Sequence, residues 1–406
     1  MALASFGILP TGIPGNPVPF DMHVPKSEQH HMSNLVRKAE IGVPSYYNTH
    51  ANPAEGIFGI TREWLCNAQD AWVHDFHWGD HQDKYNSYPN YRINVTTSDG
   101  QLFDLHFAGL FSQKTDAKPI ILMHGWPGAW TEFVPMLDLL IAKYTPETLP
   151  YHVVVPSIPD YGLSTRADEL ETELKIEVAA EAMNELMVNL GFDKYVAQGG
   201  DIGAFLAQTM CGLFEECIAF HLNMYFMTEE QSAAVADIPI TPEEQAQVDH
   251  AAEWVRFGTS YGNEHGTRPS TISLVLMTNP LAMLAWMGEK FIEWSDNRKP
   301  LPLDTILSFV SFYWFTDSYG RAMWAYRELM GEVGGTFPTL PLSLTKPFGF
   351  SSFAIEIAAL PRSWAEFLFP NLVLYRSHDI GGHYAALEEP ELFLEDVEEF
   401  MSLVAF

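Results

Sequence analysis

The chain has 406 residues, which is enough for one large domain with insertions or for two domains. Its composition, with 47% hydrophobic and 18% charged residues, excludes an intrinsically disordered chain. The formal net charge of −30, from 22 Lys and Arg against 52 Asp and Glu, argues against nucleic acid and anionic membrane surfaces as partners, because a negative field repels both.

The cysteines and the N-terminal residues bear on the cellular compartment. Cys66, Cys211 and Cys217 form no CxxC pair, which favours a reducing compartment. Residues 1–20 lack the basic segment of a secretory signal peptide. No apolar run reaches the roughly 18 residues that suggest a membrane-spanning helix. We therefore expect a soluble, cytoplasmic protein without a membrane span.

Residues 1–90 are rich in proline, aromatic residues and short helical segments, one of which is expected at 61–76. This composition predicts a meander that wraps around the rest of the chain rather than an independent domain. Residues 91–110 then alternate apolar and polar side chains around Asp99 and Gly100, which is the pattern of a β-hairpin with a tight turn.

Short apolar runs, each a candidate buried strand, follow in alternation with helical segments. Strands are expected at the start of 118–128 and in 151–162, 194–200 and 217–226, and a helix is expected in 171–190. This β-α-β alternation predicts an α/β protein with a mostly parallel sheet and helices on both faces.

The strand pattern stops between residues 228 and 345, where helical segments such as 280–294 and 301–315 dominate. We expect an all-helical cap there, over the C-terminal ends of the strands, where open α/β sheets bind ligands. The sheet resumes in 371–384, and a last helix is expected at 389–404. The predicted organisation has four parts, a meander (1–90), the first part of the core (91–227), a helical cap (228–345) and the last part of the core (346–406).

A glycine-rich turn places an aspartate at the junction of a predicted strand and helix. In "GGDIGA" the small residues Gly199, Gly203 and Ala204 surround Asp201. Small neighbours are needed where a residue on a strained strand-to-helix turn projects its side chain from the sheet, which is the position of a nucleophile. Taken alone, the motif also fits a phosphate-binding turn or a turn without function, although it lacks the GxGxxG spacing of a dinucleotide-binding loop.

The motif "HGWPG" at 124–128 follows a predicted buried strand. In hydrolases with a nucleophile turn, a loop in this place donates one backbone N–H to the oxyanion hole, and the residue after the nucleophile donates the other. Those donors are Trp126 and Ile202 in this chain. The same residues would also make an ordinary β-turn, but the strand before them and their place upstream of Asp201 favour the oxyanion hole.

A histidine, His383 in "GGHYAALEEP", follows the last predicted strand. Its place far downstream of Asp201 matches the chain order nucleophile, acid, histidine. His378 and Asp379 lie nearby and suggest a metal site, but no pair of carboxylates or histidines has helical ligand spacing. We expect neither a metal nor a cofactor.

Five segments together resemble the microsomal-type and fungal epoxide hydrolases of the α/β-hydrolase superfamily. They are "HGWPG", "QGGDIG", "EHGTRPST", "KPFGFSSF" and "GGHYAALEEP", and the resemblance extends over nearly the whole chain. It implies an α/β-hydrolase fold with a helical cap, with Asp201 as the nucleophile and His383 as the general base. The same resemblance implies that Glu356 is the acid that orients the histidine, and that Tyr261 and Tyr326 activate the epoxide oxygen.

The implied reaction explains why the turn carries a carboxylate. A carboxylate is ionised at neutral pH and can attack an epoxide carbon without a base. The attack leaves an ester, which water can cleave, whereas a serine would leave an ether. The two tyrosines would donate hydrogen bonds and then a proton to the opening oxygen, and His383 would deprotonate a water. The N–H groups of Trp126 and Ile202 would hold the oxyanion, a contact worth roughly 3 kcal/mol, and the product would be a vicinal diol.

One residue departs from the pattern of this family. The segment "PSIPDYG" (156–162) carries Asp160 where relatives usually have glycine. The simpler interpretation is a tolerated turn residue, because aspartate suits turns. The alternative is an added carboxylate at the mouth of the substrate pocket that guides water or a substrate hydroxyl and so modulates substrate scope.

Three other functions compete with epoxide hydrolysis. A haloalkane dehalogenase forms the same aspartyl ester but needs halide-binding donors; Trp126 could serve, whereas the tyrosine pair and the long N-terminal segment argue against it. An epoxide-opening cyclase would replace water by a substrate hydroxyl. A hydrolase-fold binding protein would have lost part of the Asp–Glu–His set, which is intact here. The expected partner is a small-molecule epoxide, with a homodimer left open.

Overall fold

The computed structural model describes residues 5–168, 170–330 and 338–406. At its centre is a ten-stranded sheet in the order β1-β2-β3-β5-β4-β7-β8-β9-β10, with β6 paired to β3. The strands are β1 (Val18–Pro19), β2 (Asn90–Thr96), β3 (Leu102–Leu110), β4 (Lys118–Met123), β5 (Tyr151–Pro156), β6 (Thr165–Arg166), β7 (Tyr195–Gly199), β8 (Cys217–Leu222), β9 (Phe348–Ser352) and β10 (Leu372–Ser377).

The sheet has an antiparallel edge and a parallel remainder. Strands β2 and β3 form the expected hairpin, in which the turn at Gly100 uses a φ of 89° that glycine adopts readily. From β5 to β10, every pair of neighbouring strands is parallel. Strands β4, β5 and β7 are almost entirely buried, as their continuous apolar sequences require when both faces of a sheet are covered. The predicted α/β fold is confirmed.

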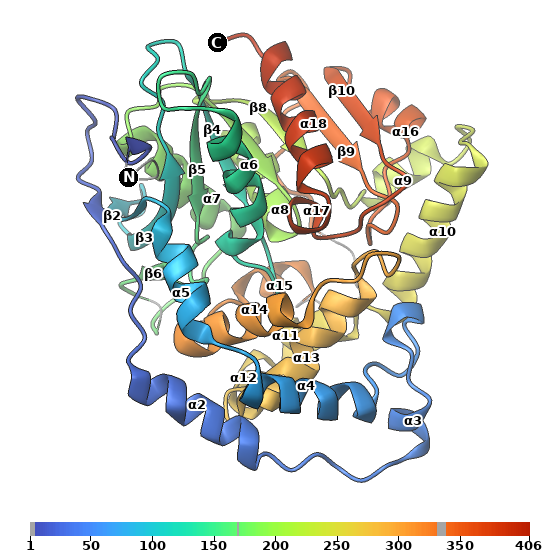
Figure 1. The fold of residues 1–406 in the computed structure, drawn as a ribbon. Coiled ribbons are helices and arrows are strands. Elements are labelled where there is room, and N and C mark those ends of the chain that lie inside the picture. The colour runs from blue at the N-terminus through green and yellow to red at the C-terminus, as the bar shows by residue number, and fades with distance from the viewer. Residues whose placement is uncertain (1–4, 169, 331–337) are drawn as a thin grey trace.

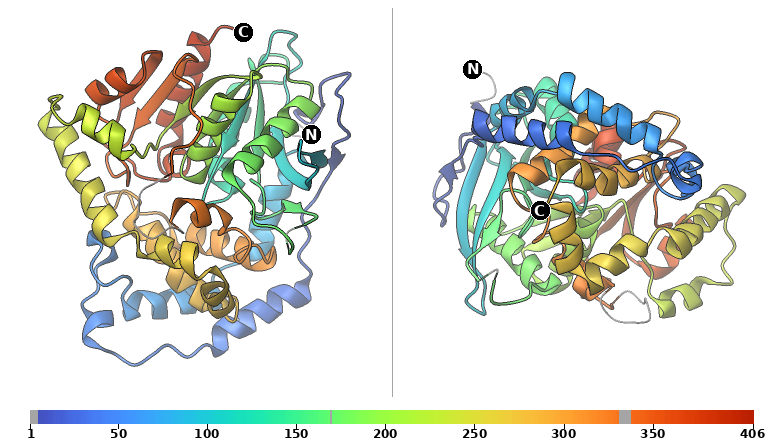
Figure 2. Two further views of the ribbon diagram at one scale, coloured as in Figure 1. Left: turned by 180° about the vertical axis from the view of Figure 1, so that it is seen from behind. Right: turned by 90° about the horizontal axis from the view of Figure 1, so that it is seen from below.

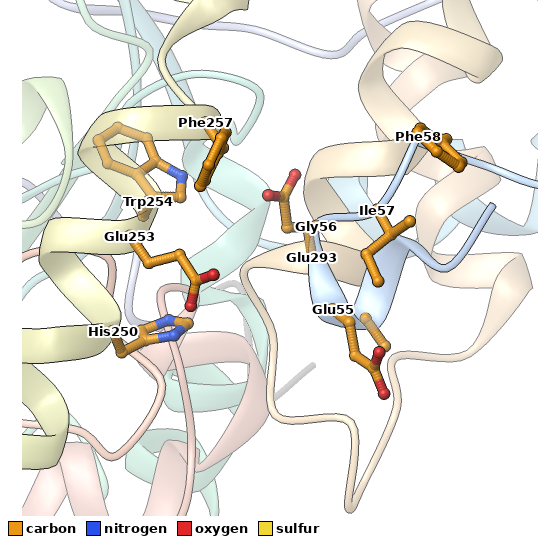
Figure 3. A pocket seen from close by; sticks show the side chains of 11 residues that line it. Glu55, Gly56, Ile57, Phe58, His250, Glu253, Trp254, Phe257 and Glu293 are labelled. Carbon is orange, nitrogen blue, oxygen red and sulfur yellow. The ribbon is translucent and has the colours of Figure 1, made fainter. Parts of the chain in front are cut away.

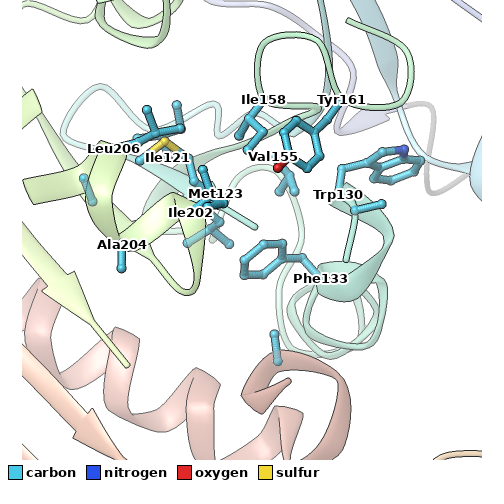
Figure 4. Packing of buried hydrophobic residues seen from close by; sticks show 14 of the residues in the cluster. Ile121, Met123, Trp130, Phe133, Val155, Ile158, Tyr161, Ile202, Ala204 and Leu206 are labelled. Atoms are coloured by element: carbon cyan, nitrogen blue, oxygen red, sulfur yellow. The ribbon is translucent and has the colours of Figure 1, made fainter. Parts of the chain in front are cut away.

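Helices cover both faces of the sheet (Figure 1). Helices α6 (Val134–Lys143), α17 (Ala385–Glu388) and α18 (Pro390–Leu403) pack together on one face, and α7 (Ile176–Asn189) and α8 (Ile202–Leu213) pack together on the other. Helix α16 (Arg362–Leu368) packs beside β10. Figure 4 shows the buried core next to the start of α8, where Ile121, Met123, Val155 and Ile202 are almost fully excluded from solvent.

Between β8 and β9, the described residues form seven helices, which together are called the cap. They are α9 (Glu229–Val235), α10 (Pro242–Phe257), α11 (Ser260–Thr267), α12 (Pro269–Leu276), α13 (Pro280–Glu293), α14 (Leu303–Phe315) and α15 (Trp324–Leu329). The Tyr313 hydroxyl donates to the Gly128 carbonyl (2.8 Å), and the Trp324 indole donates to the Pro159 carbonyl (2.8 Å). The cap therefore lies over the loops that follow β4 and β5, at the C-terminal ends of the strands. Residues 331–337, within the predicted cap, are outside the described part of the chain.

The N-terminal segment runs along the side of the cap that faces away from the sheet (Figures 1 and 2). Its helices are α2 (Lys26–Lys38), α3 (Tyr46–Thr49), the 3-10 helix η1 (Pro53–Glu55), α4 (Arg62–His74) and α5 (Trp78–Ser87). Helices α2 and η1 contact α13, and α4 and α5 contact α14. The cap is therefore held between the sheet and this segment.

Length and apolar composition decide whether a helix can cross a membrane. No single helix there is long and apolar enough to cross a membrane. Helices α12 and α13 reach that length and composition only as a pair, which is bent by 117°.

Candidate active site

Asp201 lies on a strained turn between β7 and α8. Its backbone has φ 49° and ψ −127°, a positive φ that is rare outside glycine and is found where surrounding structure enforces it. A Cβ at Gly199 would collide with the Gly203 carbonyl, and a Cβ at Gly203 would collide with the Met123 carbonyl. The small residues of the motif are therefore needed for the close approach of strand, turn and helix that presents the Asp201 carboxylate.

The Asp201 carboxylate is held at the N-terminus of α8. The Trp126 backbone N–H donates to Oδ1 of Asp201 at 2.7 Å. Oδ1 of Asp201 and the Ile202 nitrogen both border Gly125, where an added Cβ would lie 1.9 Å from Oδ1 and 2.5 Å from that nitrogen. The N-terminus of a helix also favours negative charge. The position of Oδ1 is thus one at which a developing oxyanion would be stabilised.

Loops after β9 and β10 bring Glu356 and His383 to the other side of Asp201. The His383 Nδ1 lies 2.8 Å from Oε1 of Glu356, and its Nε2 lies 3.3 Å from Oδ2 of Asp201. The Ile357 N–H donates to the same Oε1 of Glu356 (2.7 Å), and the His383 N–H donates to the Trp294 carbonyl (2.9 Å). The ring of His383 is therefore fixed between two carboxylates, and its backbone is held by the Trp294 carbonyl.

The two carboxylates decide the protonation of His383. Burial by itself lowers the pKa of the imidazole, but the charges and hydrogen bonds of Glu356 and Asp201 outweigh burial, and the pKa of His383 lies well above 6.5. His383 is therefore an imidazolium at neutral pH while both carboxylates are charged. Loss of the negative charge on Asp201 would lower the pKa of His383.

Two cap tyrosines face the Asp201 side of the site. Tyr261 on α11 and Tyr326 on α15 are buried, and the Tyr326 hydroxyl lies 3.4 Å from the Tyr261 hydroxyl. The Tyr261 ring stacks on the Trp126 ring with centroids 5.1 Å apart, and the Tyr326 ring meets the same indole edge-on at 6.2 Å. Burial, together with the nearby Asp201 charge, raises the pKa of both phenols well above 10. Both tyrosines are therefore neutral hydrogen-bond donors.

Asp160 lies in a turn and takes part in a buried ion pair. Its φ is 63°, the left-handed conformation that glycine and aspartate tolerate better than most residues. Its Oδ2 accepts from Nε of Arg166 at 2.7 Å, and both side chains are almost fully buried. This geometry favours the interpretation of Asp160 as a turn residue, with a carboxylate that contacts Arg166.

The histidine and aspartate pair near His383 is occupied by other contacts. The Nε2 of His378 lies 2.7 Å from Oδ2 of Asp396, and the carbonyl of Asp379 accepts from Arg298 (2.7 Å). Among the residues that the structure describes, no group of three or more His, Cys, Asp or Glu side chains is placed to hold a metal ion.

Sequence reasoning missed three residues that border the site. The Trp294 ring lies 5.2 Å from the His383 ring, and the Lys290 ammonium lies 5.2 Å above the Tyr261 ring. The buried Glu132 carboxyl lies close enough to Asp201 and His383 to interact with both charges. No sequence signal marks Trp294 or Lys290 as a site residue, because both look like ordinary residues of an amphipathic helix. Glu132 follows Gly128 by one helical turn, a spacing that would have indicated a side chain folded back over "HGWPG".

A large cavity and a small one lie near the site. One of about 640 Å³ lies between the η1 segment and α10, and is lined by Phe58, Trp254, Phe257 and Glu293 among others (Figure 3). The Trp254 ring contacts the Trp294 ring at 6.0 Å, so these two indoles stand between this cavity and His383. The other cavity, of about 20 Å³, is lined by Asp201 and His383 themselves.

Known proteins resemble this chain in sequence and in architecture. The family model "Epoxide hydrolase N terminus" matches residues 17–133, and the model "alpha/beta hydrolase fold" matches residues 118–289. An epoxide hydrolase homologue of Dothistroma septosporum is 38% identical over 404 residues, which is 100% of this chain and 94% of that protein. Epoxide hydrolase 1 of Oryctolagus cuniculus is 27% identical over 377 residues, with 86% and 81% covered.

A solved structure resembles this chain in both sequence and fold. The Aspergillus niger epoxide hydrolase is 38% identical and superposes with a TM-score of 0.89, covering 99% of this chain and 100% of that one. The turn with Asp201, the His383–Glu356 pair and the two cap tyrosines thus lie within a fold and a sequence that this chain shares with epoxide hydrolases over its full length. The chain belongs to the microsomal-type epoxide hydrolases and is an epoxide hydrolase of the α/β-hydrolase fold.

Proposed function

We propose that the enzyme opens epoxides through a covalent ester on Asp201. The observation that carries this proposal is the position of the His383 ring between Glu356 Oε1 (2.8 Å) and Asp201 Oδ2 (3.3 Å). Oδ1 accepts the Trp126 N–H, so Oδ2 is the oxygen available to attack. A new bond forms between Oδ2 and an epoxide carbon while the ring C–O bond breaks.

The tyrosine pair receives the oxygen that leaves the epoxide carbon. The Tyr261 and Tyr326 hydroxyls donate hydrogen bonds to this oxygen, and one of them transfers its proton as the negative charge develops. The proposal is supported by their burial and by the high pKa of both phenols, which keeps the donors protonated before the substrate binds. The tyrosinate recovers its proton from solvent after the reaction.

Hydrolysis of the ester depends on a change in the protonation of His383. Ester formation removes the charge of Asp201, which is one of the two carboxylates that raise the pKa of His383. The imidazolium then loses its proton more readily and becomes a general base for water. Water attacks the ester carbonyl carbon and gives a proton to Nε2, and the oxyanion at Oδ1 is held by the Trp126 N–H and, as a second donor, by the Ile202 N–H. The diol oxygen leaves with the proton from His383.

We assign the four parts of the chain to separate tasks within this reaction. Residues 91–227 and 346–406 carry Asp201, Glu356 and His383, and residues 228–345 carry the tyrosines. Residues 1–90 hold the cap from outside and form one wall of the 640 Å³ cavity.

The proposal is tested with a panel of epoxides, chiral analysis of the products and Asp201→Ala as the control. We expect vicinal diols from the intact enzyme and a fall in kcat on the order of 10⁶-fold in D201A, as for removal of other catalytic nucleophiles. A cyclic ether from hydroxy-epoxides would identify the cyclase instead, and halide release from haloalkanes would identify the dehalogenase. Diol formation by D201A at the rate of the intact enzyme would contradict the assignment. Light scattering of the same sample tests the predicted option of a homodimer.

A further inference from the structure

The cavity of about 20 Å³ lies directly beside the reacting atoms. Its lining includes Asp201, His383, Glu132 and Asn223. A cavity of about 10–15 Å³ is enough to hold one water, so this cavity has room for a water and is too small for an epoxide. It therefore offers a position next to both the Asp201 carboxyl and the His383 ring that the substrate does not occupy.

Local structure directs the Glu132 carboxyl toward this cavity. Glu132 lies in the 3-10 helix η2 (Trp130–Phe133), which follows the "HGWPG" turn. Its carboxyl folds back over Gly128, where a Cβ would collide with Oε1 of Glu132, and the Ala129 backbone hydrogen-bonds to the carboxyl. The glycine of the turn therefore leaves room for a carboxyl beside the site, and a side chain at Gly128 would displace it.

The charge state of Glu132 suits a site next to a nucleophilic carboxylate. Burial raises the pKa of Glu132 from 4.5 to about 8, while the His383 charge lowers it and the Asp201 charge raises it. Glu132 is therefore mostly neutral at pH 7. A neutral carboxylic acid accepts a hydrogen bond from water through its carbonyl oxygen and adds no second negative charge beside Asp201.

Asn223 lines the same cavity from the end of β8. Its Oδ1 accepts from the Gln198 amide at 3.1 Å, which fixes the orientation of the Asn223 side chain. The amide also packs on Gly200, where a Cβ would lie 2.8 Å from Oδ1. With Oδ1 held in this way, the Nδ2 group is the part of Asn223 that can donate to a water.

We propose that Glu132 and Asn223 are positioning residues that hold the hydrolytic water in this cavity, an inference that rests on the covalent mechanism proposed above. Asn223 Nδ2 donates to the water oxygen, and the two water protons point to Glu132 and to Nε2 of His383. The remaining lone pair faces the ester carbonyl carbon of Asp201. When the water attacks, its O–H bond to His383 breaks and the proton moves to Nε2, so Glu132 transfers no proton.

The test separates ester formation from ester hydrolysis in Glu132→Met and Glu132→Gln by rapid quench and intact-protein mass spectrometry. Met fills the space without a polar group that replaces the carboxyl, and Gln keeps a carbonyl acceptor. In E132M we expect ester formation to stay within about threefold and hydrolysis to slow by roughly 10–100-fold, the usual cost of a misplaced reactant. Steady-state kcat and KM then fall together while kcat/KM is unchanged, because kcat/KM reports ester formation. E132Q recovers most of the hydrolysis rate.

Glu388→Gln is the matched control. Burial raises the pKa of Glu388 to about 7, but its carboxyl accepts the backbone N–H groups of Asp296 (2.7 Å) and Tyr384 (2.9 Å) instead. We expect E388Q to leave the ratio of the two rates unchanged. Asn223→Ala removes the second residue proposed to hold the water, so it provides the same test even if E132M does not fold.

Normal ester hydrolysis in E132M or in N223A would overturn the proposal, and so would equal slowing of both steps. Failure of the covalent mechanism looks different, because no ester would then form in the intact enzyme or in a variant that lacks the His383 base.

Discussion

The site has a half formed by the core and a half formed by the cap, and different interactions hold the two halves in place. On the core side, Asp201, His383 and Glu356 are joined by polar contacts of 2.8 and 3.3 Å, and the Trp126 N–H binds Asp201 at 2.7 Å. On the cap side, the tyrosine hydroxyls are 3.4 Å apart, and Tyr261 is placed by ring stacking on Trp126. The core half therefore depends on hydrogen bonds between ionised groups, and the cap half depends on packing.

This difference matches what each half is proposed to do. Bonds to carbon form and break on the core side, where small errors in geometry are costly. On the cap side, the phenols need free O–H groups for the substrate oxygen, and ring packing positions them without engaging those groups strongly. Changes in the two halves should therefore affect different steps, and the following variants are ordered by the expected size of the effect.

The largest effect is expected for His383→Gln on the core side. Glutamine cannot take the proton of water, so hydrolysis should slow by on the order of 10⁴-fold while Asp201 still attacks the epoxide. Intact-protein mass spectrometry should then show the enzyme accumulating with the mass of one added substrate. Turnover near that of the intact enzyme would remove His383 from the role of general base.

An intermediate effect is expected for the cap tyrosines. Tyr261→Phe and Tyr326→Phe keep the ring packing, and each should slow ester formation by roughly 10–100-fold, with about 10³-fold or more in the double variant. Hydrolysis of the ester should be unchanged, as measured in single turnovers. Tyr319→Phe is the control, because this buried tyrosine contacts His265 (2.9 Å) near the same Trp126 ring. Equal slowing of both steps in Y261F would break the division between the halves.

A pH titration tests the coupling within the core half. The raised pKa of His383 means that the free enzyme keeps an imidazolium above pH 6.5, and the proton is lost as the pH rises through that raised pKa. Asp201→Asn removes one of the two carboxylates, so the pKa of His383 should fall, which NMR of the ring can measure. The rate of ester hydrolysis should rise with the fraction of His383 that is neutral, and that fraction is set by the lower pKa. A pKa of His383 unchanged in D201N would contradict the proposed switch.

The smallest effect on catalysis is expected at Asp160. Asp160→Gly keeps the positive φ but removes one of the partners of Arg166, so the free energy of unfolding should fall by about 2 kcal/mol, the scale of a hydrogen bond to a charged group. Chemical denaturation measures this change. The kcat should change by less than roughly fivefold, or about 1 kcal/mol in the barrier. Asp317→Gly, at an exposed residue with φ 47°, is the matched control. A large change in kcat without loss of stability would support the substrate-guiding alternative.

Much of the fold could be predicted because its signals are local. The buried strands are continuous apolar runs, and the hairpin carries its own turn residues at Asp99 and Gly100. The cap helices α9, α10 and α13 carry their own N-terminal capping residues. The predicted helix in 171–190 begins only at Ile176, whose N–H donates to the Glu328 carboxylate from the cap (2.6 Å). A contact between segments so far apart in the chain leaves no trace in the helical pattern.

The residues of the site likewise divide into those with a local sequence signal and those placed by contacts between distant segments. Asp201 and the glycines around it could be located because steric demands of the turn appear in adjacent residues. Trp294 and Lys290 could not, because Trp294 contacts His383 only after the cap has packed on the core, and Lys290 contacts Tyr261 only after the cap helices have folded together. Glu132 lies between these cases, since its spacing from Gly128 is local but its cavity requires Asn223, which follows β8.

The ester on Asp201 is the central claim, and a single turnover in oxygen-18 water with excess enzyme tests it most directly. If water attacks the ester carbonyl, the label enters the peptide that contains Asp201, and the first diol carries none. Labelled diol together with an unlabelled Asp201 peptide would show direct attack of water on the epoxide and would contradict the covalent mechanism.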